Sequence, residues 1–230
     1  MTSLVLLPGL DGTGELFADF VAALPADITT AVIAYPNSQL IDYAALEAFV
    51  RERLPERPFV LLAESFSGPI GLAIAAAPPP QLRGLVLCCT FAKLPFPFAR
   101  WMRHLVRVAP MAMLPQSSLD VALLGGQASA LLRARFAATL ATVAPRVLQQ
   151  RAQQALQIDV SARLQDIALP TLYLRGNRDR LIGGRAHRLL ADGLPSLQTL
   201  SFDAPHFLLQ VRPVEAAAAV SDFVRACTDR

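Results

Sequence analysis

Short runs of apolar residues recur along the chain, and they are separated by segments in which apolar residues return every three or four positions. Six of the runs predict strands. They are Ser3–Leu7, Thr29–Ala34, Phe59–Ala63, Leu82–Cys88, Thr171–Leu174 and Leu197–Phe202. Apolar strands that alternate with helices are typical of a parallel sheet covered on both faces. We therefore expect an α/β fold with a mostly parallel, six-stranded sheet flanked by helices.

The segments between these strands carry helical periodicity and stop at helix-breaking residues. Pro25 ends the first, and three consecutive prolines end the helix that follows the third strand. The predicted helices are Glu15–Leu24, Tyr43–Leu54, Phe66–Ala77, Arg185–Ala191 and Val214–Ala226.

One long segment interrupts the alternation. Residues 91–168 contain no convincing strand and are expected to form three or four helices, broken at prolines and at a Gly–Gly pair. We interpret the segment as a helical cap over the carboxyl edge of the sheet, where ligands bind in open α/β sheets. A helical insertion packed at the side of the sheet is the alternative. The predicted core is formed by residues 1–90 and 169–230, with the cap inserted into this single domain.

Ser65 lies where a strand runs into a helix with almost no loop, in the sequence A-E-S-F-S-G. A turn of this kind presents a serine hydroxyl at the edge of the sheet, and it requires small residues two positions before and after the serine. Ala63 and Ser67 are small enough. Ser65 is therefore a candidate nucleophile, and a serine that only caps the following helix is the alternative.

A serine nucleophile needs a general base and an acid that orients the base. His206 follows the last predicted strand and Asp179 follows the fifth, so both loops emerge at the same edge of the sheet as Ser65. Serine, then acid, then histidine is one of the known orders in which the three residues of a catalytic triad follow one another along a chain. A turn aspartate paired with a neighbouring arginine is the alternative for Asp179. Less suitably placed histidines and acids are His104, His187, Asp159, Asp166, Asp192 and Asp203.

The tetrahedral intermediate of acyl transfer needs main-chain N–H donors for its oxyanion. The amide of Phe66, directly after the candidate nucleophile, is one expected donor. The loop after the first strand, Pro8–Gly14, contains three glycines that allow close approach to a substrate. The amide of Leu10 in this loop is the second expected donor. A phosphate-binding turn is a weaker interpretation, since the dinucleotide fingerprint and a P-loop lysine are both missing.

With these residues, the chain resembles the α/β-hydrolase superfamily, and specifically its small, cap-bearing, carboxylesterase-like serine hydrolases. The resemblance is carried by L-L-P-G-L-D-G-T-G, A-E-S-F-S-G, L-R-G-N-R-D-R-L-I and A-P-H-F-L-L-Q. Pro8 stands where family members often have histidine, and Ala63 and Ser67 replace the two glycines of the family motif. The resemblance implies a sheet that lacks the first two strands of the family, with the spatial order 2-1-3-4-5-6.

The resemblance also implies a reaction. The expected activity is cleavage of a carboxylic ester or thioester of a small to medium acyl substrate, through an acyl-enzyme on Ser65 and without a cofactor or metal. C–C hydrolases, acyltransferases and perhydrolases use the same scaffold, and a weakly catalytic small-molecule receptor is a further alternative. Dehalogenases and epoxide hydrolases are disfavoured because they require an acid at position 65.

Charge is distributed unevenly. Residues 93–166 contain nine basic and three acidic residues, whereas the remainder contains twelve basic and fifteen acidic residues. Aromatic residues at the start of the cap are Phe91, Phe96, Phe98 and Trp101, and the neighbouring arginines are Arg100, Arg103 and Arg107. One hypothesis is a solvated basic face with a local aromatic core. The other is that Phe91, Phe96 and Trp101 line an acyl pocket, while the arginines attract an acyl carrier or another anionic acyl donor.

Composition narrows the remaining classes. Apolar residues make up 53% of the chain and charged residues 17%, which indicates a globular protein. A net charge of +3 and the lack of a recognition motif argue against nucleic-acid binding. No signal peptide or membrane span is evident, and the three cysteines lack metal-ligand spacing. We expect a cytoplasmic protein with buried, reduced thiols.

Overall fold

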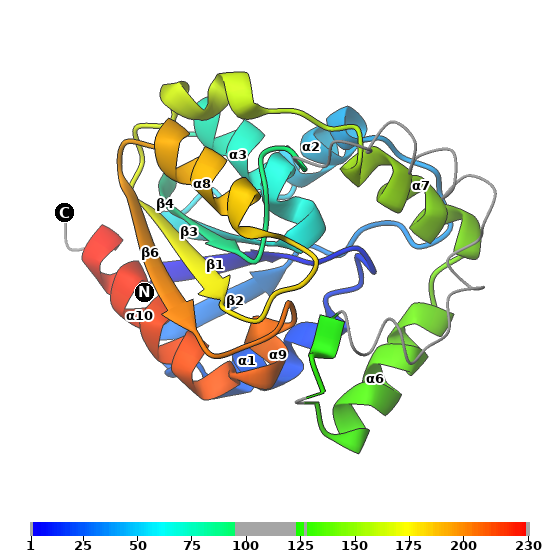
Figure 1. Ribbon diagram of the computed structural model, residues 1–230. Coiled ribbons are helices and arrows are strands. Elements are labelled where there is room, and N and C mark those ends of the chain that lie inside the picture. Colours follow the sequence, from blue (N-terminus) through cyan, green and yellow to red (C-terminus); the bar gives the residue numbers. More distant parts are fainter. Residues whose placement is uncertain (1, 95–122, 127, 229–230) are drawn as a thin grey trace.

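A computed structural model describes residues 2–94, 123–126 and 128–228 and contains a six-stranded sheet at its centre (Figure 1). Its strands are β1 (Thr2–Leu7), β2 (Ile28–Val32), β3 (Phe59–Glu64), β4 (Leu82–Cys88), β5 (Thr171–Gly176) and β6 (Leu197–Phe202). Every pair of neighbouring strands is parallel, and the spatial order is β2-β1-β3-β4-β5-β6. The predicted fold class and strand order are confirmed.

Helices cover both faces of the sheet (Figure 1). One face carries α1 (Ala18–Ala23), α9 (Leu208–Val211) and α10 (Pro213–Thr228), and the other carries α2 (Tyr43–Arg51), α3 (Gly68–Ala76) and α8 (Gly184–Gly193). Side chains of β1 alternate between the two cores: Val5 and Leu7 pack toward α2 and α3, whereas Leu4 and Leu6 pack toward α10. Burial on both faces explains why the central strands β1 and β3 are almost continuously apolar. The edge strands β2 and β6 are half-buried or exposed over most of their length, and they contain more polar residues.

Several predicted boundaries shift by a few residues. The helix expected at Glu15–Leu24 begins as a 3-10 turn, η1 (Glu15–Phe17), before α1. The helix expected from Phe66 begins as a second 3-10 turn, η2 (Ser65–Ser67), and continues as α3. Strand β2 ends at Val32, two residues before the predicted end. These differences lie at element ends, where periodicity carries little information.

The segment between β4 and β5, called the insertion below, is helical in its described part. It contains α6 (Ala130–Ala141), α7 (Pro145–Ala155) and a 3-10 turn, η5 (Ser161–Asp166). An antiparallel bridge joins Lys93 to Asp159, and their side chains form an ion pair of 2.6 Å. The insertion therefore leaves and re-enters the core at neighbouring points.

Two further expectations concern the cysteines and membrane-spanning helices. Cys88, Cys89 and Cys227 are buried, as predicted. Within the described ranges, helices are too short or too polar to cross a bilayer.

Candidate active site

Ser65 lies at the carboxyl end of β3 in a strained backbone conformation. Its φ is 48°, in the left-handed region that residues other than glycine rarely adopt. The hydroxyl of Thr90, which follows β4, donates a hydrogen bond to the Ser65 carbonyl. Ala63 is fully buried, and a Cβ at Gly71 of α3 would come within 2.8 Å of its methyl group. Small residues around the turn thus allow α3 to pack against β3 and hold Ser65 at the edge of the sheet.

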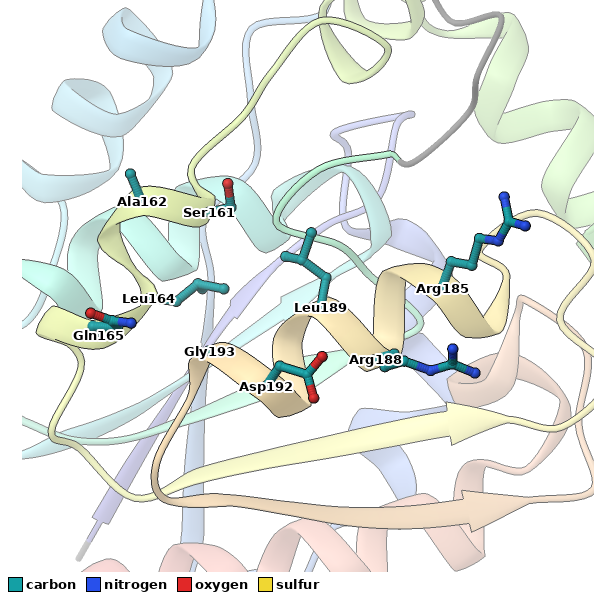
Figure 2. A pocket seen from close by; sticks show the side chains of 9 residues that line it. All are labelled: Ser161, Ala162, Leu164, Gln165, Arg185, Arg188, Leu189, Asp192 and Gly193. Atoms are coloured by element: carbon teal, nitrogen blue, oxygen red, sulfur yellow. The ribbon is translucent and has the colours of Figure 1, made fainter.

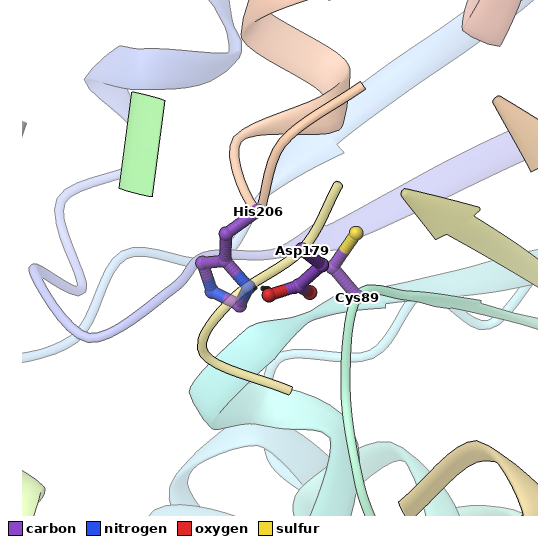
Figure 3. A group of neighbouring side chains, drawn as sticks. All are labelled: Cys89, Asp179 and His206. Atoms are coloured by element: carbon purple, nitrogen blue, oxygen red, sulfur yellow. Dashed lines mark hydrogen bonds and ion pairs between the residues drawn. The ribbon is translucent and has the colours of Figure 1, made fainter. Parts of the chain in front are cut away.

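A chain of hydrogen bonds joins Ser65 to two residues distant in sequence. Ser65 Oγ lies 2.8 Å from His206 Nε2, and His206 Nδ1 lies 2.8 Å from Asp179 Oδ2. The His206 and Asp179 side chains are only 2% and 4% exposed. Asp179 Oδ1 accepts hydrogen bonds from the amides of Leu181 and Ile182 at 2.8 and 2.9 Å. The carboxylate is therefore fixed from both oxygens, and it holds the imidazole of His206 (Figure 3). This contact orients the ring so that Nε2 faces Ser65.

The loops that carry Asp179 and His206 are bonded to each other. Asn177 N–H donates to the Phe202 carbonyl at 2.8 Å, and Arg178 N–H donates to the Ala204 carbonyl at 3.0 Å. Gly176 allows this approach, because a Cβ there would lie 2.5 Å from the Pro205 carbonyl oxygen. The β5 and β6 loops therefore dock as one unit.

The loop after β1 is held at each carbonyl from Pro8 to Gly12. The Pro8 carbonyl accepts from Ser67 Oγ, and the Gly9 carbonyl accepts from Gly12 N–H. The guanidinium of Arg151 donates to the carbonyls of both Leu10 and Asp11. The Gly12 carbonyl accepts from Tyr35 N–H. The carbonyl of Gly9 belongs to the same peptide unit as the Leu10 N–H. Because the two groups of a trans peptide point in opposite directions, the bond from Gly12 directs the Leu10 N–H away from the turn. The loop lies beside the nucleophile, since a Cβ at Gly9 would be 4.0 Å from Ser65 Cβ.

The other expected oxyanion donor, Phe66, follows Ser65 at the beginning of η2, where the first amides of a helix have no partner in an earlier turn. Its carbonyl accepts a hydrogen bond from the Tyr43 hydroxyl at 2.9 Å, and its ring stacks on Tyr43 with centroids 4.7 Å apart. Tyr43 thus fixes the Phe66 backbone from its carbonyl side.

Glu64 is a buried carboxyl group directly behind the nucleophile. It accepts hydrogen bonds from Gln210 Nε2 at 3.0 Å and from the Gly9 amide. Burial raises the pKa of Glu64 to about 7; the bond from Gln210 lowers it, the charge of Asp11 raises it, and His206 and the Gly9 amide lower it. Glu64 thereby connects the nucleophile turn, the loop after β1 and α9.

Cys89 lies close to the hydrogen-bonded chain and, like Ser65, has a positive φ, at 44°. Its sulfur and the ligand atoms of Asp179 and His206 lie within 4.8 Å of one another (Figure 3). These three groups could ligate a metal ion. A metal would have to break the hydrogen bond between His206 and Asp179. The observed arrangement therefore favours His206 as an acceptor of the Ser65 proton over a metal ligand.

Three of the six rival acids and histidines have other partners. Asp203 pairs with Arg178 at 2.7 Å, and Asp159 pairs with Lys93. His187 Nε2 lies 3.0 Å from Thr199 Oγ1. Asp192 lines a shallow depression of about 500 Å³ between η5 and α8, together with Leu189 (Figure 2). His104 lies outside the described residues, and Asp166 is the exposed last residue of η5.

The predicted acyl-pocket residues are only partly described. Phe91 is 2% exposed and packs with Ile182 and Ala186. Phe96, Phe98, Trp101, Arg100, Arg103 and Arg107 lie outside the described residues. Two other basic residues of the insertion contact acidic side chains on helices of the core. Arg135 pairs with Asp19 of α1 at 2.9 Å, and Arg163 lies 3.9 Å from Glu47 of α2.

Sequence reasoning did not identify several residues that support this site. The motif marks Ser67 only as a small residue, although its hydroxyl donates to the Pro8 carbonyl and lies 2.6 Å from the Tyr35 hydroxyl. Glu64 did carry a signal, because a charged residue at the end of an apolar strand is unusual. Thr90 and Arg151 carried none, since their roles arise from contacts between distant segments.

Comparisons with known proteins agree with this architecture. The family model described as serine aminopeptidase, S33, matches residues 30–206. Among curated proteins, no sequence matches the chain.

Solved structures match nearly the whole chain. A lipase-esterase related protein from Clostridium acetobutylicum has a TM-score of 0.80 at 17% identity, covering 96% of this chain and 94% of that one. An esterase from Exiguobacterium antarcticum has a TM-score of 0.83 at 14% identity, covering 98% and 92%. A bromoperoxidase from Bacillus anthracis has a TM-score of 0.83 at 16% identity, covering 97% and 92%. At these identities the likeness establishes the fold.

Proposed function

The chain belongs to the serine aminopeptidase S33 family of hydrolases, and from this premise we propose that it cleaves a carboxylic ester or thioester through an acyl-enzyme on Ser65. The observation that supports this proposal is the hydrogen-bonded chain from Ser65 through His206 to Asp179. A serine hydroxyl becomes a useful nucleophile when a base accepts its proton as it attacks. His206 Nε2 lies at the required distance.

In the acylation step, Ser65 Oγ attacks the acyl carbonyl while its proton moves to His206 Nε2. Asp179 stabilises the imidazolium that forms and stays ionised. The amides of Leu10 and Phe66 donate to the oxyanion, and losing one such donor costs about 3–4 kcal/mol of barrier in well-studied hydrolases. His206 then gives its proton to the leaving group, and the acyl group remains on Ser65.

In the deacylation step, His206 accepts a proton from water, which attacks the acyl carbonyl and releases the acid. Ser65 recovers its proton from His206. Apart from this water, the proposed cycle uses side chains and main-chain amides of the protein.

A fluorophosphonate probe tests this mechanism. We expect it to label Ser65, as mapped by peptide mass spectrometry, and we expect His206→Ala to abolish labelling. His187→Ala is the matched control, because His187 bonds Thr199 away from Ser65. Labelling at another residue, or undiminished labelling of His206→Ala, would contradict the proposal.

Substrate class is tested by three parallel assays. We expect turnover of p-nitrophenyl esters and acyl thioesters, with a preference among acyl chains that bounds the pocket. Aminoacyl p-nitroanilides test the aminopeptidase activity that the family's description suggests. Faster turnover of the anilides than of every ester would reassign the substrate.

We further propose, as a hypothesis on substrate, that Arg100, Arg103 and Arg107 attract an anionic acyl donor such as an acyl carrier. Replacing all three with glutamine should raise KM for an anionic acyl thioester and leave KM for a neutral p-nitrophenyl ester unchanged. Equal changes for both substrates would contradict it.

A further inference from the structure

Arg151 is an unusual residue of the insertion, because its side chain is buried in the core. It extends from α7 and is 2% exposed. One guanidinium nitrogen, Nη1, donates to the carbonyls of Leu10 at 2.9 Å and Asp11 at 2.6 Å. The other, Nη2, donates to the Pro36 carbonyl at 2.9 Å, and the group lies 5.6 Å from the centre of the Tyr35 ring.

Ordinary ion pairing does not explain this burial. Within the described ranges, no carboxylate lies at ion-pair distance from the guanidinium, although Asp11 is close enough to raise its pKa against the lowering effect of burial. A buried cation is costly unless its hydrogen bonds are made. Here those bonds go to the backbone, and two of the three acceptors are consecutive carbonyls in the loop after β1.

The position of those carbonyls links Arg151 to the candidate oxyanion site. Leu10 supplies the expected donor N–H, and Arg151 holds the carbonyl of the same residue. Gly12 in this loop has a φ of 74°, and a Cβ there would lie 2.4 Å from Arg151 Nη1. The loop backbone therefore wraps closely around the guanidinium. Burial keeps Arg151 from contacting a substrate directly.

We propose that Arg151 is a positioning residue, which holds the loop after β1 so that the Leu10 amide faces the oxyanion formed on Ser65. The insertion thereby completes the catalytic site of the core. This inference rests on the function proposed above. Preorganised donors stabilise a transition state more than a bound substrate, so loss of Arg151 should lower kcat and leave KM little changed.

Three variants test the proposal. Arg151→Met removes the three hydrogen bonds and keeps the aliphatic part of the side chain. Arg151→Lys keeps the charge, but a single ammonium cannot span three carbonyls in the way a planar guanidinium does. Arg146→Met is the matched control, because Arg146 also lies on α7 and donates to a carbonyl, that of Ser38 at 3.2 Å, outside the oxyanion loop.

We expect kcat for a p-nitrophenyl ester to fall about 10²- to 10³-fold in Arg151→Met, comparable to losing one oxyanion donor. The kcat of Arg151→Lys should fall less, and the kcat of Arg146→Met should match that of the wild type. The rate of fluorophosphonate labelling at Ser65 should fall in parallel, because the phosphonyl oxygen accepts hydrogen bonds from the same main-chain amides. Thermal unfolding measures stability separately, and the kinetics are measured well below the lowest midpoint.

Wild-type kcat and labelling rate in a less stable Arg151→Met would overturn the proposal, since that is the result of a purely structural role. A rise in KM without a fall in kcat would also overturn it. If Arg151→Met does not fold, Arg151→Lys decides by the same criteria. Absence of Ser65 labelling in the wild type would instead contradict the proposed function itself.

Discussion

The hydroxyl of Ser67 donates a hydrogen bond to the main-chain carbonyl of Pro8, which joins the turn carrying Ser65 to the loop after β1. The Tyr35 hydroxyl lies 2.6 Å from Ser67 Oγ and donates to it, because the single Ser67 proton is directed at Pro8. Burial raises the pKa of Tyr35 far above its ordinary value, so the hydroxyl stays protonated at neutral pH. Ser67, which replaces a glycine of the family motif, thus links the nucleophile turn to the loop after β1 and to Tyr35 by hydrogen bonds.

Replacing Ser67 with alanine should preserve the turn, which requires a small residue, and remove both hydrogen bonds. Leaving buried polar groups without a partner costs about 1–3 kcal/mol, so we expect a loss of that size in the free energy of unfolding, together with a lower kcat. Ser221→Ala is the control, since Ser221 is also buried and donates to a carbonyl, that of Ala217, but lies on α10. Equal kcat in both variants would contradict a role for Ser67 in the site.

Replacing Asp179 with asparagine should lower kcat by about 10⁴-fold with little change in KM, because the amide no longer selects the imidazole tautomer that accepts the Ser65 proton. Steady-state kinetics at saturating ester measure the effect. Asp203→Asn is the control: Asp203 is nearer to His206 in sequence but pairs with Arg178. A larger loss in the Asp203 variant would make Asp203 the acid.

Glu64 predicts a pH dependence of stability. Its pKa of about 7 in the folded protein exceeds the ordinary value of 4.5. The folded protein therefore keeps a proton that the unfolded chain has released between these values. The stabilisation is complete below pH 4.5 and is lost as pH rises through 7. Asp11, His206, Gln210 and the Gly9 amide face the carboxyl group.

Glu64→Gln removes this titration and keeps a carbonyl acceptor for the Gly9 amide. Urea unfolding between pH 4.5 and 8 should show the variant gaining stability relative to the wild type as pH rises. Glu56→Gln, at an exposed glutamate, should run parallel to the wild type. Parallel curves for Glu64→Gln as well would refute the prediction.

Gly176→Ala should separate the loops that carry Asp179 and His206. Its Cβ would lie 2.5 Å from the Pro205 carbonyl oxygen and 2.7 Å from that of Ala204. A displacement of catalytic groups by 1 Å can cost about 100-fold in rate, and we expect a kcat loss of that order with a lower unfolding midpoint. Gly183→Ala, where a Cβ meets nothing within 4 Å, should keep the wild-type kcat. A Gly176 variant as active as this control would show that the loops adapt.

The sequence predicted the parts of the site that follow strands. Ser65 directly follows β3, Asp179 and His206 lie in the loops after β5 and β6, and the carboxyl ends of parallel strands meet at one edge of a sheet. Local pattern and chain order were sufficient for these three residues. The strand order followed from a resemblance to a known fold, since periodicity does not specify which strands are neighbours.

The supporting residues could not be predicted in this way, because their roles depend on docking between distant segments. Periodicity identified a helix near Arg151, but nothing in the spacing of arginines indicates which one enters the core. Tyr35 marked the end of a strand, and its contact with Ser67 exists only because β2 lies beside β1. Thr90 follows β4 and reaches Ser65 only across the edge of the sheet.

The Lys93–Asp159 bridge brings the ends of the insertion together, so the segment between them has the form of an exchangeable cassette. Grafting a foreign cassette between these two residues is an obvious route to new substrate specificity. Arg151 restricts that route, because one position of the cassette holds a loop of the core. A successful chimera must either supply a cation at the equivalent point of α7 or carry a redesigned loop after β1 that holds its own carbonyls.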